Sequence, residues 1–275
     1  MSGTLFVVAT PIGNLADASP RSLEVLRAAD LVACEDTRTT RTLLARYGID
    51  TPTVALHQHN ERAASGKLLN LLKEGKDLAL VSDAGTPTLS DPGALLVEAA
   101  HRAGVKVSPV PGPNAAAAAF SAAGFAADRF LFAGFLPAST AARRKALEAL
   151  EVDCPLILYE APHRIAQTVQ DLAERFGPER EIAIGRELTK KFEEMARMKL
   201  GDAAGWLRAE PKRTQGEFVL VIAAGQPAAP QAADADRILE ALLEAMAPSE
   251  AAKIAARITG LPRRLLYQKA LQRSK

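Results

Sequence analysis

The hydrophobic positions in the first part of the chain form short runs that alternate with longer amphipathic stretches. Five runs are short, apolar and rich enough in β-branched residues to be buried strands, and they cover residues 4–9, 31–34, 53–56, 78–82 and 105–110. Helical patterns lie between them, at residues 20–29, 38–47, 61–73 and 93–103. This alternation predicts a mainly parallel sheet covered on both faces. We therefore expect a first α/β domain at residues 1–113.

A second series of apolar runs follows the alanine-rich stretch at residues 115–119. Its predicted strands cover residues 129–134, 156–159, 182–185, 195–200 and 216–223. Helical patterns at residues 141–150 and 164–176 separate the first three runs. The later runs lack a long crossover, so they should pair antiparallel in a mixed sheet. A second α/β domain is expected at residues 114–225.

The end of the chain has a third pattern. Residues 226–233 are rich in Pro and Ala and poor in bulky apolar side chains, which is typical of a linker. Three short helices are predicted after it, at residues 234–246, 249–259 and 262–272. Ser249 is a favourable N-cap, Gly260 is a favourable C-cap, and Pro262 suits the start of a helix. The module at residues 234–275 therefore has helix-turn-helix spacing, which ordinary helical hairpins share.

The composition is that of an ordinary globular protein. The 275 residues are 48% hydrophobic and 24% charged, which favours neither a disordered nor a membrane protein. The run at residues 4–9 is too short for a signal-peptide core, and no stretch approaches the ~18 apolar residues of a spanning helix. Cys34 and Cys154 are the only cysteines, so a disulfide framework is not expected. We expect a cytoplasmic protein without a membrane span.

Charge is distributed unevenly along the chain. Residues 253–275 carry seven Lys or Arg and no Asp or Glu, which leaves −5 for the other 252 residues because the whole chain carries +2. A basic end on an acidic body suits contact with a polyanion, because each neutralised phosphate releases counterions. Such a run also occurs where Lys and Arg merely solubilise a terminal helix.

Several common kinds of site have no signature in this sequence. It contains neither G-x-G-x-x-G nor G-x-S-x-G, and the Gly66-Lys67 pair lacks the earlier glycine of a phosphate-binding loop. His57 and His59 have no nearby cysteine or third ligand that would complete a metal site. Dinucleotide, nucleoside triphosphate, serine-hydrolase and metal sites are therefore disfavoured.

Three loops rich in Gly and Pro follow predicted strands of the first domain. They read ATPIGN at residues 9–14, SDAGTPTLSDPG at residues 82–93 and PVPGPNA at residues 109–115, with Ser82, Asp83, Ser90, Asp91 and Asn114 spaced among them. Loops after parallel strands gather along one edge of a sheet, so these should converge. Any one of them is ordinary turn chemistry. Together they predict a crevice for a bulky, weakly charged ligand, because glycine admits close approach and proline fixes loop shape.

These loops belong to a set of longer motifs that occur in order: VATPIGNL, ACEDTR, LVSDAGTPTLSDPG, PVPGPNA, FAGFLP and YEAPHRI. With them the chain resembles the tetrapyrrole methylase family, and in particular the group of that family that modifies ribosomal RNA. The resemblance implies two α/β domains of tetrapyrrole methylase type, S-adenosylmethionine in the cleft between them, and a homodimer. It also implies 2′-O-methylation of a cytidine in the decoding region of 16S rRNA, with the free RNA or the small ribosomal subunit as partner.

The resemblance also implies which residues bind the cofactor. They are Asp83, Ala84, Gly85, Thr86 and Pro87 in one loop and Pro111, Gly112, Pro113 and Asn114 in another. The first glycine-rich turn of tetrapyrrole enzymes is altered here to Pro11-Ile12-Gly13-Asn14. This departure argues against a porphyrin-type substrate. It leaves open whether Pro11 and Gly13 contact cofactor, RNA ribose or both.

Methyl transfer to a ribose hydroxyl would need positioning and a proton acceptor. The sulfonium already activates the methyl group, so no metal is required, whereas a base would accelerate the reaction by about 10²- to 10⁴-fold. Three acidic residues near the predicted strand ends are candidates for that base: Asp36, Glu61 and Glu160. Basic residues predicted to contact RNA are Arg38, Arg143, Arg144, Arg164, Arg186, Lys190, Arg263 and Arg264.

The sequence leaves two other functions open. One is methylation of a tetrapyrrole or another small molecule, and the other is a non-catalytic regulator that binds nucleic acid through the terminal helices. A simple regulator needs no elaborate crevice, so the three loops favour an enzyme.

Overall fold

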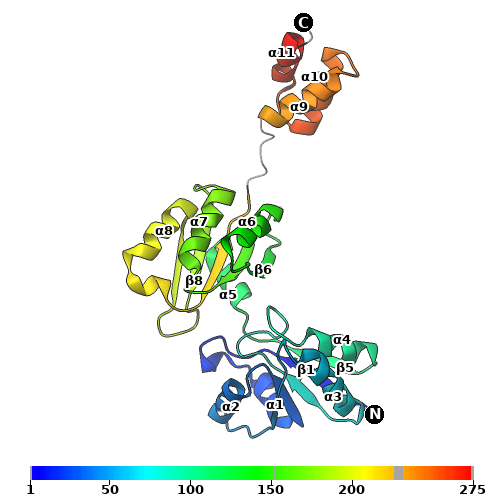
Figure 1. The fold of residues 1–275 in the computed structure, drawn as a ribbon, viewed down its shortest axis with the longest axis vertical. Coiled ribbons are helices and arrows are strands. Elements are labelled where there is room, and N and C mark those ends of the chain that lie inside the picture. Colours follow the sequence, from blue (N-terminus) through cyan, green and yellow to red (C-terminus); the bar gives the residue numbers. More distant parts are fainter. Residues whose placement is uncertain (1, 151–152, 226–231, 274–275) are drawn as a thin grey trace. The chain divides into compact units, whose positions relative to one another are not determined.

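In the computed structural model, which describes residues 2–150, 153–225 and 232–273, five parallel strands form the first sheet (Figure 1). The strands are β1 (Thr4–Val8), β2 (Leu31–Cys34), β3 (Thr53–Ala55), β4 (Leu78–Leu80) and β5 (Lys106–Val110), in the spatial order β3-β2-β4-β1-β5. Neighbouring strands pair parallel throughout. Each strand lies within the range predicted for it, so the prediction of a parallel first sheet is confirmed.

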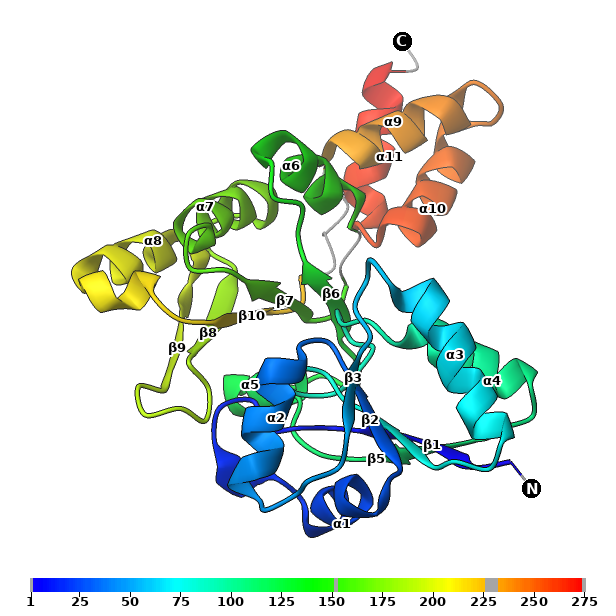
Figure 2. The same cartoon turned by 60° about the horizontal axis from the view of Figure 1, so that its bottom comes forward.

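Two pairs of helices cover the faces of this sheet. The helices are α1 (Pro20–Ala28), α2 (Thr37–Arg46), α3 (Glu61–Lys73) and α4 (Ala94–Arg102). Leu78 and Leu80 of β4 pack with the apolar side chains of α3 and α4, whereas Ala79 of the same strand packs with those of α1 and α2. Figure 2 shows the two pairs on opposite sides of the sheet. The near-continuous apolar runs of the strands follow from this burial on both faces.

The order of the strands places a crevice beside β1 and β4. These strands are neighbours, yet the chain leaving β1 enters α1 on one face and the chain leaving β4 enters α4 on the other. Loops that leave adjacent strands in opposite directions open a crevice at the carboxyl edge of the sheet, where ligands of such folds bind. Two of the three Gly-Pro loops start at these two strands.

The second sheet is mixed, as predicted. Among the described residues its five strands are β6 (Leu131–Phe135), β7 (Leu156–Glu160), β8 (Glu181–Arg186), β9 (Glu194–Lys199) and β10 (Phe218–Ile222), in the order β6-β7-β10-β8-β9. β6 and β7 pair parallel, and β10 lies antiparallel between β7 and β8. β9 pairs antiparallel with β8 at the sheet edge.

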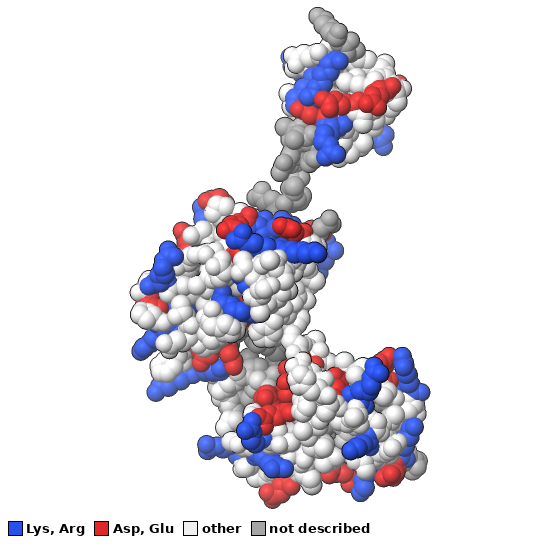
Figure 3. Space-filling model, viewed as in Figure 1, with Lys and Arg blue, Asp and Glu red and all other residues white. Residues whose placement is uncertain are grey.

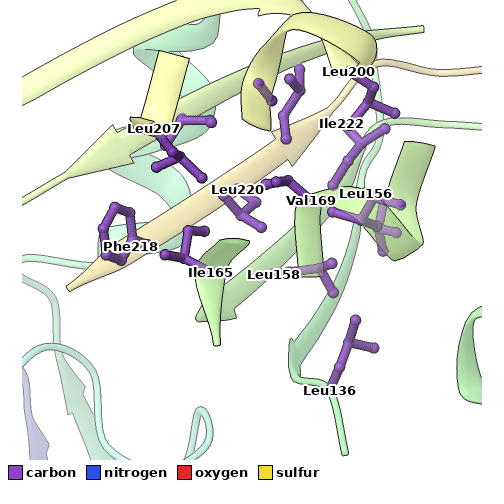
Figure 4. Packing of buried hydrophobic residues seen from close by; sticks show 14 of the residues in the cluster. Leu136, Leu156, Leu158, Ile165, Val169, Leu200, Leu207, Phe218, Leu220 and Ile222 are labelled. Atoms are coloured by element: carbon purple, nitrogen blue, oxygen red, sulfur yellow. The ribbon is translucent and has the colours of Figure 1, made fainter. Parts of the chain in front are cut away.

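Helices cover both faces of the second sheet. They are α5 (Ala115–Ala123), α6 (Thr140–Ala149), α7 (Ile165–Phe176) and α8 (Leu200–Ala209). Figure 4 shows the larger core, in which Val169 of α7 and Leu207 of α8 lie over Leu220 of β10. On the other face α5 packs through small side chains such as Ala119, close against the strands.

The sequence pattern missed two of these helices. We expected no long crossover between β9 and β10, but α8 connects them, and its glycines at positions 201 and 205 obscure the helical pattern of its buried residues. α5 lies in the alanine-rich stretch, where the uniform apolar composition has no amphipathic period. The helix forms because alanine has high helix propensity and the side chain of Asn114 accepts a hydrogen bond from the Ala117 amide.

Residues 224–275 form a separate compact unit. Its helices are α9 (Ala232–Leu243), α10 (Pro248–Thr259) and α11 (Arg263–Arg273), packed around small and leucine side chains such as Leu239 and Ala255. Gly260 ends α10 in a left-handed conformation, as predicted. The predicted N-cap at Ser249 is wrong, because Pro248 occupies the first turn and Ala247 is the cap residue.

The predicted linker and domain limits are only partly covered by the structure. Residues 226–231 of that linker lie outside the described residues, and residues 232–233 belong to α9. The predicted domain boundary at residues 113/114 falls just before α5 and stays a prediction. Within the described ranges, no helix is both long enough and apolar enough to cross a membrane.

Candidate active site

A cavity of about 350 Å³ lies where the loops at the carboxyl edge of the first sheet meet the second sheet. This volume is typical of sites for small organic ligands. From the first sheet the lining consists of Ile12 and residues 83–86, 89–91 and 114–115. From the second sheet it consists of Phe135, Leu188 and residues 159–162 and 217–219.

The three Gly-Pro loops converge beside this cavity, as predicted. Thr10 and Gly85 exchange both backbone hydrogen bonds, at 2.9 and 3.1 Å, which joins the loop after β1 to the loop after β4. The hydroxyl of Thr86 donates to the carbonyl of Pro113 at 3.2 Å, which joins the second loop to the third. The loops therefore form one connected wall.

Two glycines in this wall allow close approach of backbone segments. Gly85 has a φ of +83°, which L side chains rarely adopt. A Cβ at Gly112 would lie 3.0 Å from the Cβ of Ala9, so a larger residue there would push the first and third loops apart. Both positions are among those that the resemblance implies for cofactor binding.

Two acidic side chains, Asp83 and Asp91, line the first-sheet side of the site. Burial, together with the charges of Glu35 and Asp83, raises the pKa of Asp91 to about 6, although a hydrogen bond from Ser82 opposes the increase. Burial and the charge of Asp83 likewise raise the pKa of Glu35, and the charge of His57 partly offsets this increase. The site therefore carries a negative potential that favours a cationic ligand.

Two of the three predicted proton acceptors lie outside the cavity lining. Asp36 caps α2 by accepting the Arg38 amide, and it pairs with the Arg38 side chain, whose hydrogen bonds lower the pKa of Asp36 to about 2. Glu61 accepts the backbone N–H groups of Gly93 and Leu95, at 2.8 and 2.9 Å, and so anchors the start of α4. Both carboxylates have structural partners here.

Glu160 lines the cavity but is 2% exposed and fully engaged. Its carboxylate accepts hydrogen bonds from the Ala161 amide and Arg164 Nε, each at 2.7 Å, and from the Thr168 hydroxyl at 2.6 Å. Arg164 also donates to the carbonyl of Leu136 at 3.1 Å. Glu160 and Arg164 thus hold the loop after β7 to the loop after β6.

The structure corrects the prediction of RNA contacts for two arginines. Arg143 is 2% exposed, and it pairs with the buried Asp171, so it presents no surface to RNA. Arg186 is 8% exposed and donates to the carbonyls of Gln215 and Phe192. Arg143 lies within α6 and Arg186 is the last residue of β8, and both side chains are buried against polar partners.

Three other residues predicted to contact RNA form ion pairs with carboxylates. Lys190 pairs with Glu187 and Glu217, at 2.9 Å each. Arg38 and Arg144 are exposed at the surface and paired with carboxylates. In Figure 3, basic and acidic side chains of the first 223 residues alternate over the visible face and form no single basic patch.

Sequence reasoning found Glu160 on the second-sheet side of the cavity but missed other residues there. Glu217 precedes β10 and Phe218 and Val219 begin it; because β10 runs antiparallel to β7, its amino end meets the carboxyl end of β7 at the cavity. A search of strand carboxyl ends overlooks such a position. Phe135 and Tyr159 lie within the quoted motifs, yet their apolar rings were not expected at the site; their ring centroids are 5.6 Å apart.

The first sheet, its convergent loops and the opposing mixed sheet define a class of two-domain α/β enzymes that bind a small ligand between their sheets. The chain belongs to the tetrapyrrole (corrin/porphyrin) methylase family, which residues 4–204 match. Residues 229–274 match a C-terminal helix-turn-helix domain described for RsmI.

Relatives of similar length are known in several bacteria. The chain is 48% identical over 278 residues to the ribosomal RNA small subunit methyltransferase I of Pseudomonas aeruginosa, covering 99% of this chain and 98% of the relative. The protein of the same name from Xylella fastidiosa is 49% identical over 268 residues, with 96% and 98% covered.

Solved structures share the fold at low sequence identity. Diphthine synthase has a TM-score of 0.60 and 18% identity, over 81% of this chain and 90% of that chain. Uroporphyrin-III C-methyltransferase from Thermus thermophilus, complexed with S-adenyl homocysteine, has a TM-score of 0.56 and 17% identity, over 80% and 96%. At these identities the likeness concerns the fold.

Proposed function

We propose that this protein transfers a methyl group from S-adenosylmethionine to ribosomal RNA of the small subunit, at the ribose 2′-hydroxyl of a cytidine in the decoding region of 16S rRNA. The observation that carries the proposal is the cavity between the Gly-Pro loops and the second sheet. It occurs in a chain that matches, over nearly its full length, relatives named as small-subunit rRNA methyltransferases.

The cavity fits S-adenosylmethionine in size, wall and charge. Gly85 and Gly112 stand where a Cβ would strain or separate the loops, which leaves backbone available to a ligand. Leu188 and Val219 offer an apolar surface, and Asp83 and Asp91 offer negative charge for a cation. When bound there, the cofactor supplies a methyl group already activated by the sulfonium. Residues 83–87 and 111–114 would hold it.

The protein itself has three tasks in this reaction. Its loops orient the ribose oxygen toward the methyl carbon, which lowers the entropic part of the barrier. The apolar wall excludes water from the site. The carboxylates favour a cationic donor, and since methyl transfer removes the sulfonium charge, the same carboxylates hold the neutral product less tightly.

RNA binding is proposed for the exposed arginines, above all those of the C-terminal unit. The described residues 232–273 carry seven basic and five acidic side chains. Lys269 and Arg273 pair with Asp236, whereas Arg263 and Arg264 are exposed and form no ion pair with any described residue. The basic run is therefore partly neutralised, and its exposed charges include Lys253 and Arg257 of α10 besides the two arginines at the start of α11.

The family resemblance also leads us to infer a homodimer in the cytoplasm. Light scattering coupled to gel filtration would test the dimer. A single species of monomer mass at micromolar concentration would contradict it.

The proposed reaction is tested on small ribosomal subunits from cells that lack the enzyme. The purified protein and labelled S-adenosylmethionine should add one methyl group, and mass mapping should place it on the ribose of one cytidine. A base methyl, or transfer only to a small molecule, would contradict the proposal. Deleting residues 234–275 should weaken RNA binding more than cofactor binding; unchanged RNA affinity and salt dependence would refute a polyanion role for them.

A further inference from the structure

The loop between β8 and β9, residues 187–193, lies between the second sheet and the first Gly-Pro loop. Leu188 lines the cavity. Lys190 packs against the first Gly-Pro loop so closely that a Cβ at Gly13 would overlap its Cγ. In Figure 2 the loop between β8 and β9 extends from the second sheet toward the loops of the first. The residues at its end therefore lie beside the proposed ligand site.

Hydrogen bonds fix the shape of this loop. Glu187 donates its backbone N–H to the carbonyl of Glu217 at 2.9 Å, and its carboxylate accepts the Glu217 amide at 2.9 Å. The buried Arg186 donates to the carbonyl of Phe192 at 3.2 Å. Thr189 has a φ of +64°, which is strained for a β-branched residue. Residues that are held in such conformations cluster at active sites and ligand-binding loops.

Phe192 is exposed although its backbone is anchored. The residue is 63% exposed, the largest exposed fraction among the large apolar residues that the structure describes. Lys191 Nζ lies 5.6 Å from the centroid of this ring, and Lys191 forms no ion pair with a described residue. Single exposed apolar side chains are common, but the Cα of Phe192 is within about 7 Å of that of Lys190, which contacts the first Gly-Pro loop. A ring beside an unpaired cation suits a nucleotide, which combines the flat face of a base with a phosphate.

We propose that Phe192 stacks on an unpaired base of the RNA segment that carries the methylation target, with Lys191 contacting a phosphate of the same segment, an inference that rests on the proposed function above. The methyl group goes to the ribose, so the base does not have to enter the cavity and is available to a residue beside it. An aromatic ring stacks on any base, provided that the base is free of its neighbours. Phe192 therefore favours single-stranded or flipped-out nucleotides over paired RNA.

The test compares two substitutions of the ring. Phe192→Leu keeps an apolar side chain but removes the aromatic face, and it should weaken equilibrium binding of small ribosomal subunits by about 5- to 150-fold, the effect of one lost base–aromatic contact. Phe192→Trp keeps an aromatic face and should bind as the wild type does. The matched control is Phe130→Leu, an exposed phenylalanine that precedes β6, whose opposite end lines the cavity. This control should leave binding unchanged.

Kinetics and salt dependence separate stacking from other roles of the loop. At saturating small subunit, Phe192→Leu should recover the wild-type rate of methyl transfer, and its affinity for S-adenosylmethionine in calorimetry should be unchanged. Its slope of log affinity against log salt concentration should equal that of the wild type, because a stacked base releases no counterion. Lys191→Gln should reduce this slope by about 1. A photoreactive phenylalanine analogue at position 192 should cross-link to RNA close to the modified cytidine.

Four results would overturn the inference. One is wild-type affinity of Phe192→Leu for small subunits, and another is an equal loss in the Leu and Trp variants. The third is a loss accompanied by a change of mass in gel filtration, which would mean that Phe192 packs against a second copy of the chain. The fourth is a cross-link that maps far from the target. Binding and cross-linking are measured without methyl transfer, so failure of the proposed function is distinguishable: the wild type would then place no methyl on ribose.

Discussion

Substitution of Asp171 tests whether Arg143 is held in a buried ion pair and so has no contact with RNA. Its side chain is inaccessible to solvent and accepts Arg143 Nε at 2.7 Å and Arg144 Nε at 2.9 Å. Asp171→Ala leaves the buried Arg143 guanidinium with only weak contacts, to the Ala138 carbonyl and the Thr140 hydroxyl at 3.3 Å each. An uncompensated buried charge of this kind costs about 3–5 kcal/mol.

The magnitude can be measured by denaturant and thermal unfolding. For a unit of this size, ~2–4 °C of Tm is lost per kcal/mol, so Asp171→Ala should lower the Tm by on the order of 10 °C. Arg143→Met should cost less, about 1.5–3 kcal/mol, because Asp171 keeps Arg144 as a partner. The double variant Arg143→Met/Asp171→Leu should recover much of the loss, since an apolar pair replaces the buried ions.

The matched control is Lys145→Ala on the same helix, whose side chain is exposed and should change stability by no more than about 0.5 kcal/mol. RNA affinity of the folded Arg143→Met variant should keep the wild-type salt dependence. If Arg143→Met had unchanged stability but a slope of log affinity against log salt concentration reduced by about 1, Arg143 would contact phosphate. That result would refute the reasoning from burial.

The remaining predictions concern the loops, the acids and the tail. Gly85→Ala, at a φ of +83°, should weaken S-adenosylmethionine binding in calorimetry; wild-type affinity would contradict the strain argument. The pKa of Asp36 is lowered to about 2, so the ionised carboxylate stabilises the fold above pH 3.8, and this stabilisation is lost as the pH falls through about 2. Between these two pH values the denaturation midpoint of Asp36→Asn should depend less on pH than that of the wild type. The pKa of Asp91 is raised to about 6, so its contribution to the free energy of unfolding is full below pH 3.8 and is lost as the pH rises through about 6. The Asp91→Asn variant should not show this loss of stability. Arg263→Gln/Arg264→Gln should reduce the salt slope of RNA binding by about 2 while leaving cofactor affinity intact; an unchanged slope would exclude both as phosphate contacts.

The parallel sheet was predictable because its strands are buried on both faces. Runs such as residues 78–80 are apolar at every position, since α3 and α4 cover one face and α1 and α2 cover the other. The hydrophobic pattern did not predict the helices whose sequences lack an amphipathic period. α5 is a continuous alanine stretch and α8 contains two glycines, so neither has the alternation of apolar and polar faces that identifies a helix.

The location of the site was also predictable, whereas the state of its side chains was not. Strand order and the Gly-Pro loops indicate which edge of the sheet binds a ligand, because loops after parallel strands meet there. They contain no information on which carboxylate finds a donor. Glu61 was a candidate base from its position after β3, but the amides at the start of α4 lie within its reach and it caps that helix instead.

Charged residues close together in a motif tend to neutralise one another, and this explains why two of the predicted catalytic acids form ion pairs. Glu160 and Arg164 are four residues apart on one turn, so the acid proposed as base and the arginine proposed for RNA bind each other. Asp36 and Arg38 do the same at the start of α2. Asp91 differs because its own loop, residues 82–93, contains only acidic charges, and it forms no ion pair with a Lys or Arg among the described residues. A carboxylate without an ion pair at a cavity wall keeps its negative charge available to a cationic ligand, which is the property that the proposed cofactor requires.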